Sequence, residues 1–330
     1  MKIKTATSYN LDLLCFMNTM TANPTFTDPH KESFEKFEPF VSEKIKKRAS
    51  FLNKMNLAGL YGMIGTSLIS CLDDYQNRDL IEMLGCKSEI KKKHSKSTNP
   101  FPPFYYFMSF RLINRSAIPL AKELEAAGFK DFWHTERLPL LQERCAVLDD
   151  YFAANSKIGQ IGEMMSCYKN IDKADFTIYV CSFARPMGVK LCGNNMVYDY
   201  SYEKNDDALE VLVHELLHPL VRHKAVQPYV KALGQKHWVR EGYKNQKLGM
   251  TYRPMEMYVE ENIVFALGYY IAAQLGADLN PKEELAKRAS ADSTSQVIAP
   301  HFYDYLCENP KDPAQSFDDY FTSFVDSLNG

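Results

Sequence analysis

The sequence predicts an α+β fold in which helices predominate and a small mixed sheet lies in the middle of the chain. Two observations support this prediction. Apolar residues recur at helical spacing before residue 175 and after residue 205, whereas residues 176–202 are rich in β-branched and aromatic side chains. Helices therefore come first, a few strands follow, and helices end the chain, which is an order typical of α+β proteins.

The first half of the chain is predicted to be helical. Residues 31–85 carry amphipathic and then apolar helical patterns, and three more helices are expected over Phe104–Asn114, Ala117–Ala127 and Leu138–Ala154. Gly128 follows the second of these helices, where a C-cap glycine is common. The polar run 87–99 is predicted to be a solvated loop. It contains four lysines that could contact phosphate groups, but the net charge of the chain, −2, gives no support for such a role (Lys91, Lys92, Lys93, Lys96).

The second half contains the predicted strands and a further set of helices. Strands are expected over Phe176–Phe183, Met187–Cys192 and Met196–Tyr202, with a turn at residues 193–195. A long apolar helix follows from Ala208, with Asn205 or Asp206 as its N-cap. The last helices are expected over Pro254–Leu275, Pro281–Ala291 and Phe317–Leu328. We expect a helical region, 1–160, and a second region, 161–330, as two domains or packed as one.

The composition is that of an ordinary globular protein, since 45% of the 330 residues are hydrophobic. The near-neutral charge indicates neither nucleic acid nor an anionic membrane as a partner. No apolar stretch reaches membrane-spanning length, and Asp12 interrupts the apolar run near the N-terminus, so no signal peptide is evident. We expect a soluble protein, secreted or periplasmic if a signal was removed, and leave its oligomeric state open. The eight scattered cysteines are expected to be reduced.

One sequence motif indicates a metal site. The segment Val211–Leu220 contains His214-Glu215-Leu216-Leu217-His218, in which two histidines stand four residues apart. On a helix they lie one turn apart on the same face, where two imidazoles can share one metal ion. Glu215 lies about 100° around the helix from His214, beside the metal position, where its carboxylate can accept a proton from metal-activated water. The motif therefore predicts a zinc site with His214 and His218 as ligands and Glu215 as general base.

Zinc needs a third protein ligand and an open position for water. A Gly/His extension of the motif would place glycine and histidine where this chain has Val221 and Lys224, and His223 is one position out of register. The other source is a later carboxylate, and the apolar helix at 254–275 offers Glu256, Glu260 and Glu261. Glu256 suits an exposed first turn, whereas buried glutamates need a partner such as a cation. Helical periodicity does not choose between Glu260 and Glu261.

These residues resemble the gluzincins, the thermolysin-like clan of zinc metallopeptidases. The resemblance covers about Thr177–Leu275 and includes the segment Tyr258–Leu267, which is similar to the glutamate-bearing helix of a largely uncharacterised bacterial group. It implies a zincin-like core and Glu261 as the third ligand. The Asn-Glu pair of such helices is Glu260-Glu261 here, which keeps Glu260 open. It also implies an edge strand that pairs with an extended substrate, for which the Met187–Tyr202 hairpin is the candidate.

The expected activity is hydrolysis by water activated on one catalytic zinc ion, and the resemblance makes a peptide or protein the expected substrate. An additional donor should stabilise the oxyanion, and five side chains are candidates: Tyr243, Tyr252, Tyr258, His223 and His237. Two alternatives remain open. One is a non-catalytic zinc-containing protein that binds a partner through the helical N-terminal half, and the other is a hydrolase of non-peptide substrates.

Overall fold

The computed structural model describes residues 2–55, 59–94, 103–166, 175–186, 188–246, 254–290 and 293–328. The chain forms two compact units. The sheet unit consists of Ile3–Tyr151 and Asp175–Glu203, and the C-terminal unit consists of Met1–Lys2, Phe152–Ala174 and Lys204–Gly330. The units are interleaved along the chain, whereas the sequence predicts two consecutive regions, 1–160 and 161–330.

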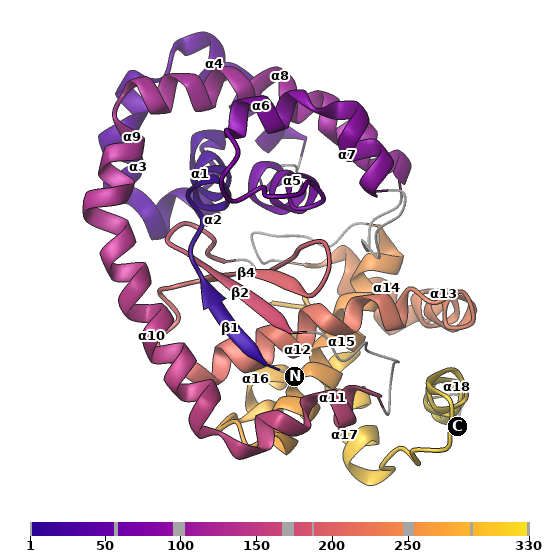
Figure 1. Cartoon of the computed structure of the whole chain (residues 1–330). Coiled ribbons are helices and arrows are strands. Elements are labelled where there is room, and N and C mark those ends of the chain that lie inside the picture. Colours follow the sequence, from indigo (N-terminus) through magenta and orange to yellow (C-terminus); the bar gives the residue numbers. More distant parts are fainter. Residues whose placement is uncertain are drawn as a thin grey trace. The chain divides into compact units, whose positions relative to one another are not determined.

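The sheet unit contains a four-stranded mixed sheet in the order β1-β2-β4-β3 (Figure 1). Its strands are β1 (Ile3–Ala6), β2 (Phe176–Cys181), β3 (Val189–Lys190) and β4 (Asn195–Asp199). β2 pairs in parallel with both β1 and β4, and β3 pairs antiparallel with β4. Every residue of β2 is buried, as expected of a central strand. The pairing of β1 with β2 explains why residues 175–203 belong with the N-terminal helices.

Helices make up most of the sheet unit. They are α1 (Tyr9–Met17), α2 (Pro24–Thr27), α3 (Lys31–Phe37), α4 (Glu43–Lys54), α5 (Thr66–Ile69), α6 (Leu80–Gly85), α7 (Lys87–His94), α8 (Pro103–Ala126), α9 (Phe129–Phe132) and α10 (Leu138–Ala154), of which α10 ends just beyond the unit. α1 is buried from Asn10 to Met17. Its carboxylate Asp12 accepts hydrogen bonds from Trp133 Nε1 at 2.7 Å and from the Phe183 amide at 3.0 Å. The acidic residue in this apolar run is thus satisfied inside the core.

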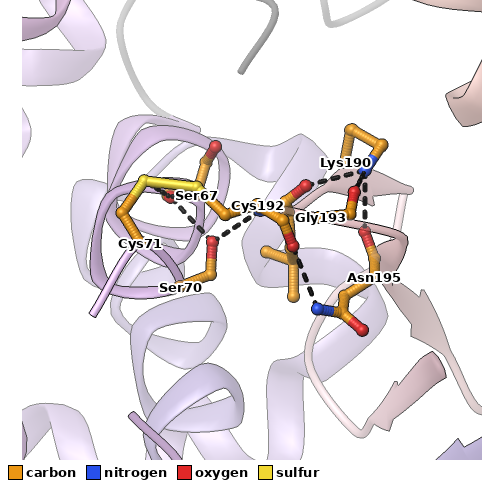
Figure 2. The surroundings of a disulfide bond; sticks show 8 residues. Ser67, Ser70, Cys71, Lys190, Cys192, Gly193 and Asn195 are labelled. Carbon is orange, nitrogen blue, oxygen red and sulfur yellow. Dashed lines mark hydrogen bonds between the residues drawn. A yellow bond between two sulfur atoms is a disulfide. The ribbon is translucent and has the colours of Figure 1, made fainter. Parts of the chain in front are cut away.

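A disulfide joins Cys71, just after α5, to Cys192, just after β3 (Figure 2). The Cys192 amide also donates to Ser70 Oγ at 2.9 Å. The turn that follows is held by Lys190 Nζ, which donates to the carbonyls of Leu191, Gly193 and Asn195. The expectation that all cysteines are reduced is wrong for this pair. Cysteines 15, 86, 145, 181 and 307 are free thiols.

The described part of the C-terminal unit is helical. Its helices are α11 (Ile161–Ser166), α12 (Asn205–Val221), α13 (Gln227–Gln235), α14 (His237–Lys244), α15 (Met255–Gln274), α16 (Pro281–Ala289), α17 (Ala299–Glu308) and α18 (Phe317–Ser327). α12 and α15 pack side by side (Figure 1). At Gly268 of α15 an added Cβ would lie 3.3 Å from Glu210 Oε1 and 3.5 Å from His214 Cα, so glycine permits the close approach.

The orientation of α15 is held by Asn262, which is fully buried. Its Oδ1 accepts hydrogen bonds from the amides of Ile298 and Ala299 at 2.7 and 3.2 Å, at the start of α17. Its Nδ2 donates to the carbonyl of Tyr258 at 2.8 Å. These hydrogen bonds tie α15 to the start of α17.

The predicted α+β class with a dominant helical content and a small mixed sheet is confirmed. Two local predictions are wrong. Residues 87–94 form helix α7 where a loop was expected, and Lys204 is the N-cap of α12 in place of Asn205 or Asp206. Among the helices of the described residues, none is both long and apolar enough to cross a membrane.

Candidate metal centre

Three polar side chains form one stripe along α12. His214, His218 and Arg222 follow one another at intervals of four residues, so they lie on one face of the helix. Both histidines are buried, and the Arg222 amide donates to the His218 carbonyl as the helix ends. Apolar neighbours such as Leu217 and Val213 are fully buried, so the packing holds this helix and its histidines in place.

Two consecutive glutamates of α15 face this stripe and meet different partners. Glu261 Oε2 lies 3.5 Å from His214 Nε2, and Glu261 Oε1 lies 3.9 Å from His218 Nε2. Glu260 Oε1 lies 2.6 Å from the other ring nitrogen of His218, Nδ1, and 2.7 Å from Arg222 Nε. The structure therefore brings Glu261 into the space between the two histidines and places Glu260 behind one of them.

The group formed by His214, His218 and Glu261 is arranged so that it could hold a metal ion. One candidate ligand atom from each residue lies within 4.8 Å of the other two. Tetrahedral zinc with bonds of about 2.0–2.2 Å separates its ligand atoms by roughly 3.4 Å, and the distance of 3.5 Å from Glu261 Oε2 to His214 Nε2 lies near that value. Two imidazoles and one carboxylate are also a donor set that catalytic zinc sites use. The residues present fit the ion.

The electrostatics of the group reflect several charged side chains that lie close together in a buried space. Burial opposes the protonation of His214, but the hydrogen bond and charge of Glu261, with Glu215 and Glu210 nearby, raise its pKa to about 9. Burial alone would raise the pKa of Glu261, but the charges of His218, His214 and Arg222 lower it below its ordinary value. The carboxylate between the histidines is thus kept ionised, which is the form that a metal ion binds.

Further groups surround His214. Glu215 is buried, and its negative charge helps to raise the pKa of His214. The ring of Phe265 packs edge-on against His214 with the centroids 4.4 Å apart. Glu210, one turn earlier on α12, is buried, and its pKa is raised to about 7 by burial, against the opposing charges of His214 and Arg288. Glu210 Oε1 has no hydrogen-bond partner among the described residues.

The other residues considered from the sequence lie elsewhere or have other partners. Glu256 is in the partly exposed first turn of α15. The side chain of His223 is 65% exposed, and its Nδ1 lies 3.6 Å from Asp318 Oδ2, so it is not part of the group. The hydroxyl of Tyr258 donates to the Thr294 carbonyl at 2.9 Å, which occupies that donor. Tyr252 lies outside the described residues.

Two candidates for oxyanion stabilisation remain with no assigned role. Tyr243 packs its ring against Tyr258 at 5.7 Å, and His237 begins α14. Sequence reasoning overlooked Arg222, although its spacing of four from His218 is the same signal that joins the two histidines. β3 is an edge strand of the sheet, and its role in substrate binding stays a prediction.

Comparison of the chain with protein-family models, with curated proteins and with solved structures found no match. The resemblance to gluzincins therefore remains a prediction from the motif and the glutamate helix.

Proposed function

We propose that this protein is a zinc-dependent hydrolase that cleaves peptide bonds, with His214, His218 and Glu261 holding one zinc ion and Glu215 as general base. The observation that carries the proposal is the clustering of ligand atoms from these three residues within 4.8 Å, next to a buried glutamate in the His-Glu-x-x-His motif. Few structural reasons other than a cation would gather two imidazoles and an ionised carboxylate in one buried space.

When bound, the zinc ion would polarise a water molecule and the substrate carbonyl. Glu215 then accepts a proton from the attacking water and donates it to the leaving amine. His214 and His218 keep their positions because their helix is buried against α15. Glu261 supplies the third ligand and a negative charge.

The peptide substrate rests on the resemblance to gluzincins, whereas water activation rests on the residues themselves. A hydrolase of other amides or esters would use the same ligands and the same base. Profiling the protein against a mixed peptide library and a set of ester substrates separates these two activities.

The decisive experiment compares the wild-type protein with Glu215→Gln. We expect the wild type to bind one zinc ion per chain and to hydrolyse peptides, and Glu215→Gln to bind zinc but lose about 10²–10⁴-fold in kcat, the usual contribution of a general base. Glu256→Gln makes the same chemical change on a partly exposed turn, so it should retain activity. A wild type that binds no metal, or a fully active Glu215→Gln, contradicts the proposal.

The same experiment addresses the non-catalytic alternative. Stoichiometric zinc without hydrolysis of any substrate, together with a fourth protein ligand on the metal, would favour a zinc-containing binding protein. A zinc-loaded structure that shows water in the fourth position would favour the hydrolase.

A further inference from the structure

The two adjacent glutamates of α15 differ in what they contact, and this difference assigns them different tasks. Glu261 faces the Nε2 atoms of both histidines, whereas Glu260 contacts His218 only at Nδ1, on the side of the ring away from Glu261. Glu260 is 6% exposed, and among the described residues the group of candidate ligands consists of His214, His218 and Glu261. It is therefore a partner of the ring and not a fourth member of the ligand group.

We propose that Glu260 and Arg222 form a positioning pair that holds the His218 ring with its Nδ1–H donating a hydrogen bond to Glu260 and its Nε2 lone pair toward the metal position. The role of this pair in metal binding rests on the proposed function. The pair itself is supported by two contacts: Glu260 Oε1 lies 2.6 Å from His218 Nδ1 and 2.7 Å from Arg222 Nε.

The chemistry of imidazole explains why such a pair matters. A neutral ring carries one proton, and only the nitrogen without it can bind a metal. A carboxylate that accepts a hydrogen bond from Nδ1–H selects the ring form in which Nε2 is free, fixes the ring plane, and makes Nε2 a stronger electron-pair donor to the metal. Partners of this kind are worth about 10–100-fold in metal affinity.

Arg222 explains how a second carboxylate can be buried beside the site. An ionised Glu260 without a counter-charge would be costly in this buried position. Arg222 lies one helical turn beyond His218 and supplies the opposite charge. With that charge compensated, Glu261 is the carboxylate that, among the described residues, lies within 4.0 Å of both Nε2 atoms.

The arrangement is asymmetric, because His214 is held differently. Within the described residues, His214 Nδ1 has no hydrogen-bond partner, and the ring packs against Phe265 instead. The pair should therefore control the proton position of His218 and leave that of His214 unchanged. This difference between two rings of one site is a signature that general loss of stability would not produce.

The test uses the full chain and two readouts. The first is the ring-nitrogen NMR spectrum of the metal-free protein, at a pH where the rings are neutral, which reports which nitrogen carries the proton. The second is the Zn²⁺ dissociation constant, measured by competition with a chelator. The variants are Glu260→Met, which removes the acceptor at similar volume, and Glu260→Gln, which keeps an acceptor oxygen. Glu256→Gln is the control on the same helix.

In the wild type we expect the His218 proton on Nδ1. Glu260→Met should distribute it over both nitrogens and weaken Zn²⁺ binding by about 10–100-fold, and Glu260→Gln should restore most of both properties. Glu256→Gln should match the wild type within about twofold. If Glu260→Met does not fold, because Arg222 loses its contact with Glu260, the double variant Arg222→Met/Glu260→Met removes both charges and should show the same loss.

Either of two results overturns the inference: a His218 proton on Nε2 in the wild type, or unchanged Zn²⁺ affinity in a folded variant without the Glu260 acceptor. Failure of the proposed function looks different. A wild type that binds no Zn²⁺ refutes the metal site, while the proton position on His218 still shows whether Glu260 and Arg222 hold the ring.

Discussion

Replacing Cys71 and Cys192 by serine removes a covalent link between two segments 121 positions apart in the sequence. We expect the double variant to keep the sheet unit folded but to unfold at a much lower temperature than the oxidised wild type. The local contacts of the β3–β4 turn do not depend on the sulfur–sulfur bond, since Lys190 Nζ and Asn195 Nδ2 hold it through backbone carbonyls. The variant therefore tests the cross-link itself.

The magnitude follows from the length of chain that the link closes. In the chain-entropy treatment, a closed loop of this length lowers the entropy of the unfolded chain by an amount worth about 5 kcal/mol at room temperature. Whole domains are stable by about 5–15 kcal/mol, so the link would supply a large fraction of the total. At about 2–4 °C for each kcal/mol in a unit of this size, Tm should fall by about 10–20 °C.

The assay is differential scanning calorimetry of protein purified under oxidising conditions. Cys307→Ser removes an exposed free thiol on α17 and should leave Tm unchanged. Treating the wild type with a reductant should reproduce most of the effect of the double variant. A Tm within about 3 °C of the wild type, or free thiols at Cys71 and Cys192 in the oxidised protein, would refute the reasoning.

Two further predictions concern the packing of α15 and the buried acid of α1. Gly268→Val should lower the free energy of unfolding by about 1–3 kcal/mol and weaken Zn²⁺ binding, because the valine side chain enters the contact with Glu210 and His214. Gly85→Ala should do neither, since nothing lies within 4 Å of the added Cβ. Calorimetry measures the stability and chelator competition the Zn²⁺ affinity, and an unchanged affinity in Gly268→Val would contradict the prediction. Burial raises the pKa of Asp12 from 3.8 to about 7, so the folded protein holds this proton more tightly than the unfolded chain does. The stability that the protonated carboxyl contributes is therefore complete below about pH 4 and is lost as the pH rises to about 7. Denaturant unfolding should show that loss, up to about 4 kcal/mol, in the wild type relative to Asp12→Asn, and parallel pH profiles of the two proteins would rule it out.

The long helices could be predicted because their signals are local. The predicted bounds of the helix at 138–154 match α10, and those at 254–275 and 317–328 match α15 and α18 within one residue at each end. α7 was missed because its run of lysines suggested a loop. It is helical because Ile90 and His94 bury one face, and Glu89 pairs with Lys93 one turn later at 3.3 Å.

Non-local pairing could not be predicted from the sequence. β1 has four residues, and it is a strand because it pairs with β2, which lies more than 160 residues further along the chain. That pairing also moves residues 175–203 out of the predicted second region and into the sheet unit. The partner of Cys71 is hidden for the same reason, since the sequence gives no indication of which of seven other cysteines lies beside it.

At the candidate site, the residues of one helix can be predicted from their spacing, whereas the residue that a second helix contributes depends on tertiary packing. The spacing of His214, Glu215 and His218 is visible in the sequence because one helix carries all three. Glu260 and Glu261 are neighbours about 100° apart on α15, so the choice between them depends on how that helix is rotated about its axis. Buried groups such as Asn262, through its hydrogen bonds to the start of α17, help set that rotation, and Gly268 sets the distance to α12. Two residues without charge therefore help decide which carboxylate meets both histidines, and the other carboxylate is left to hold His218 from behind.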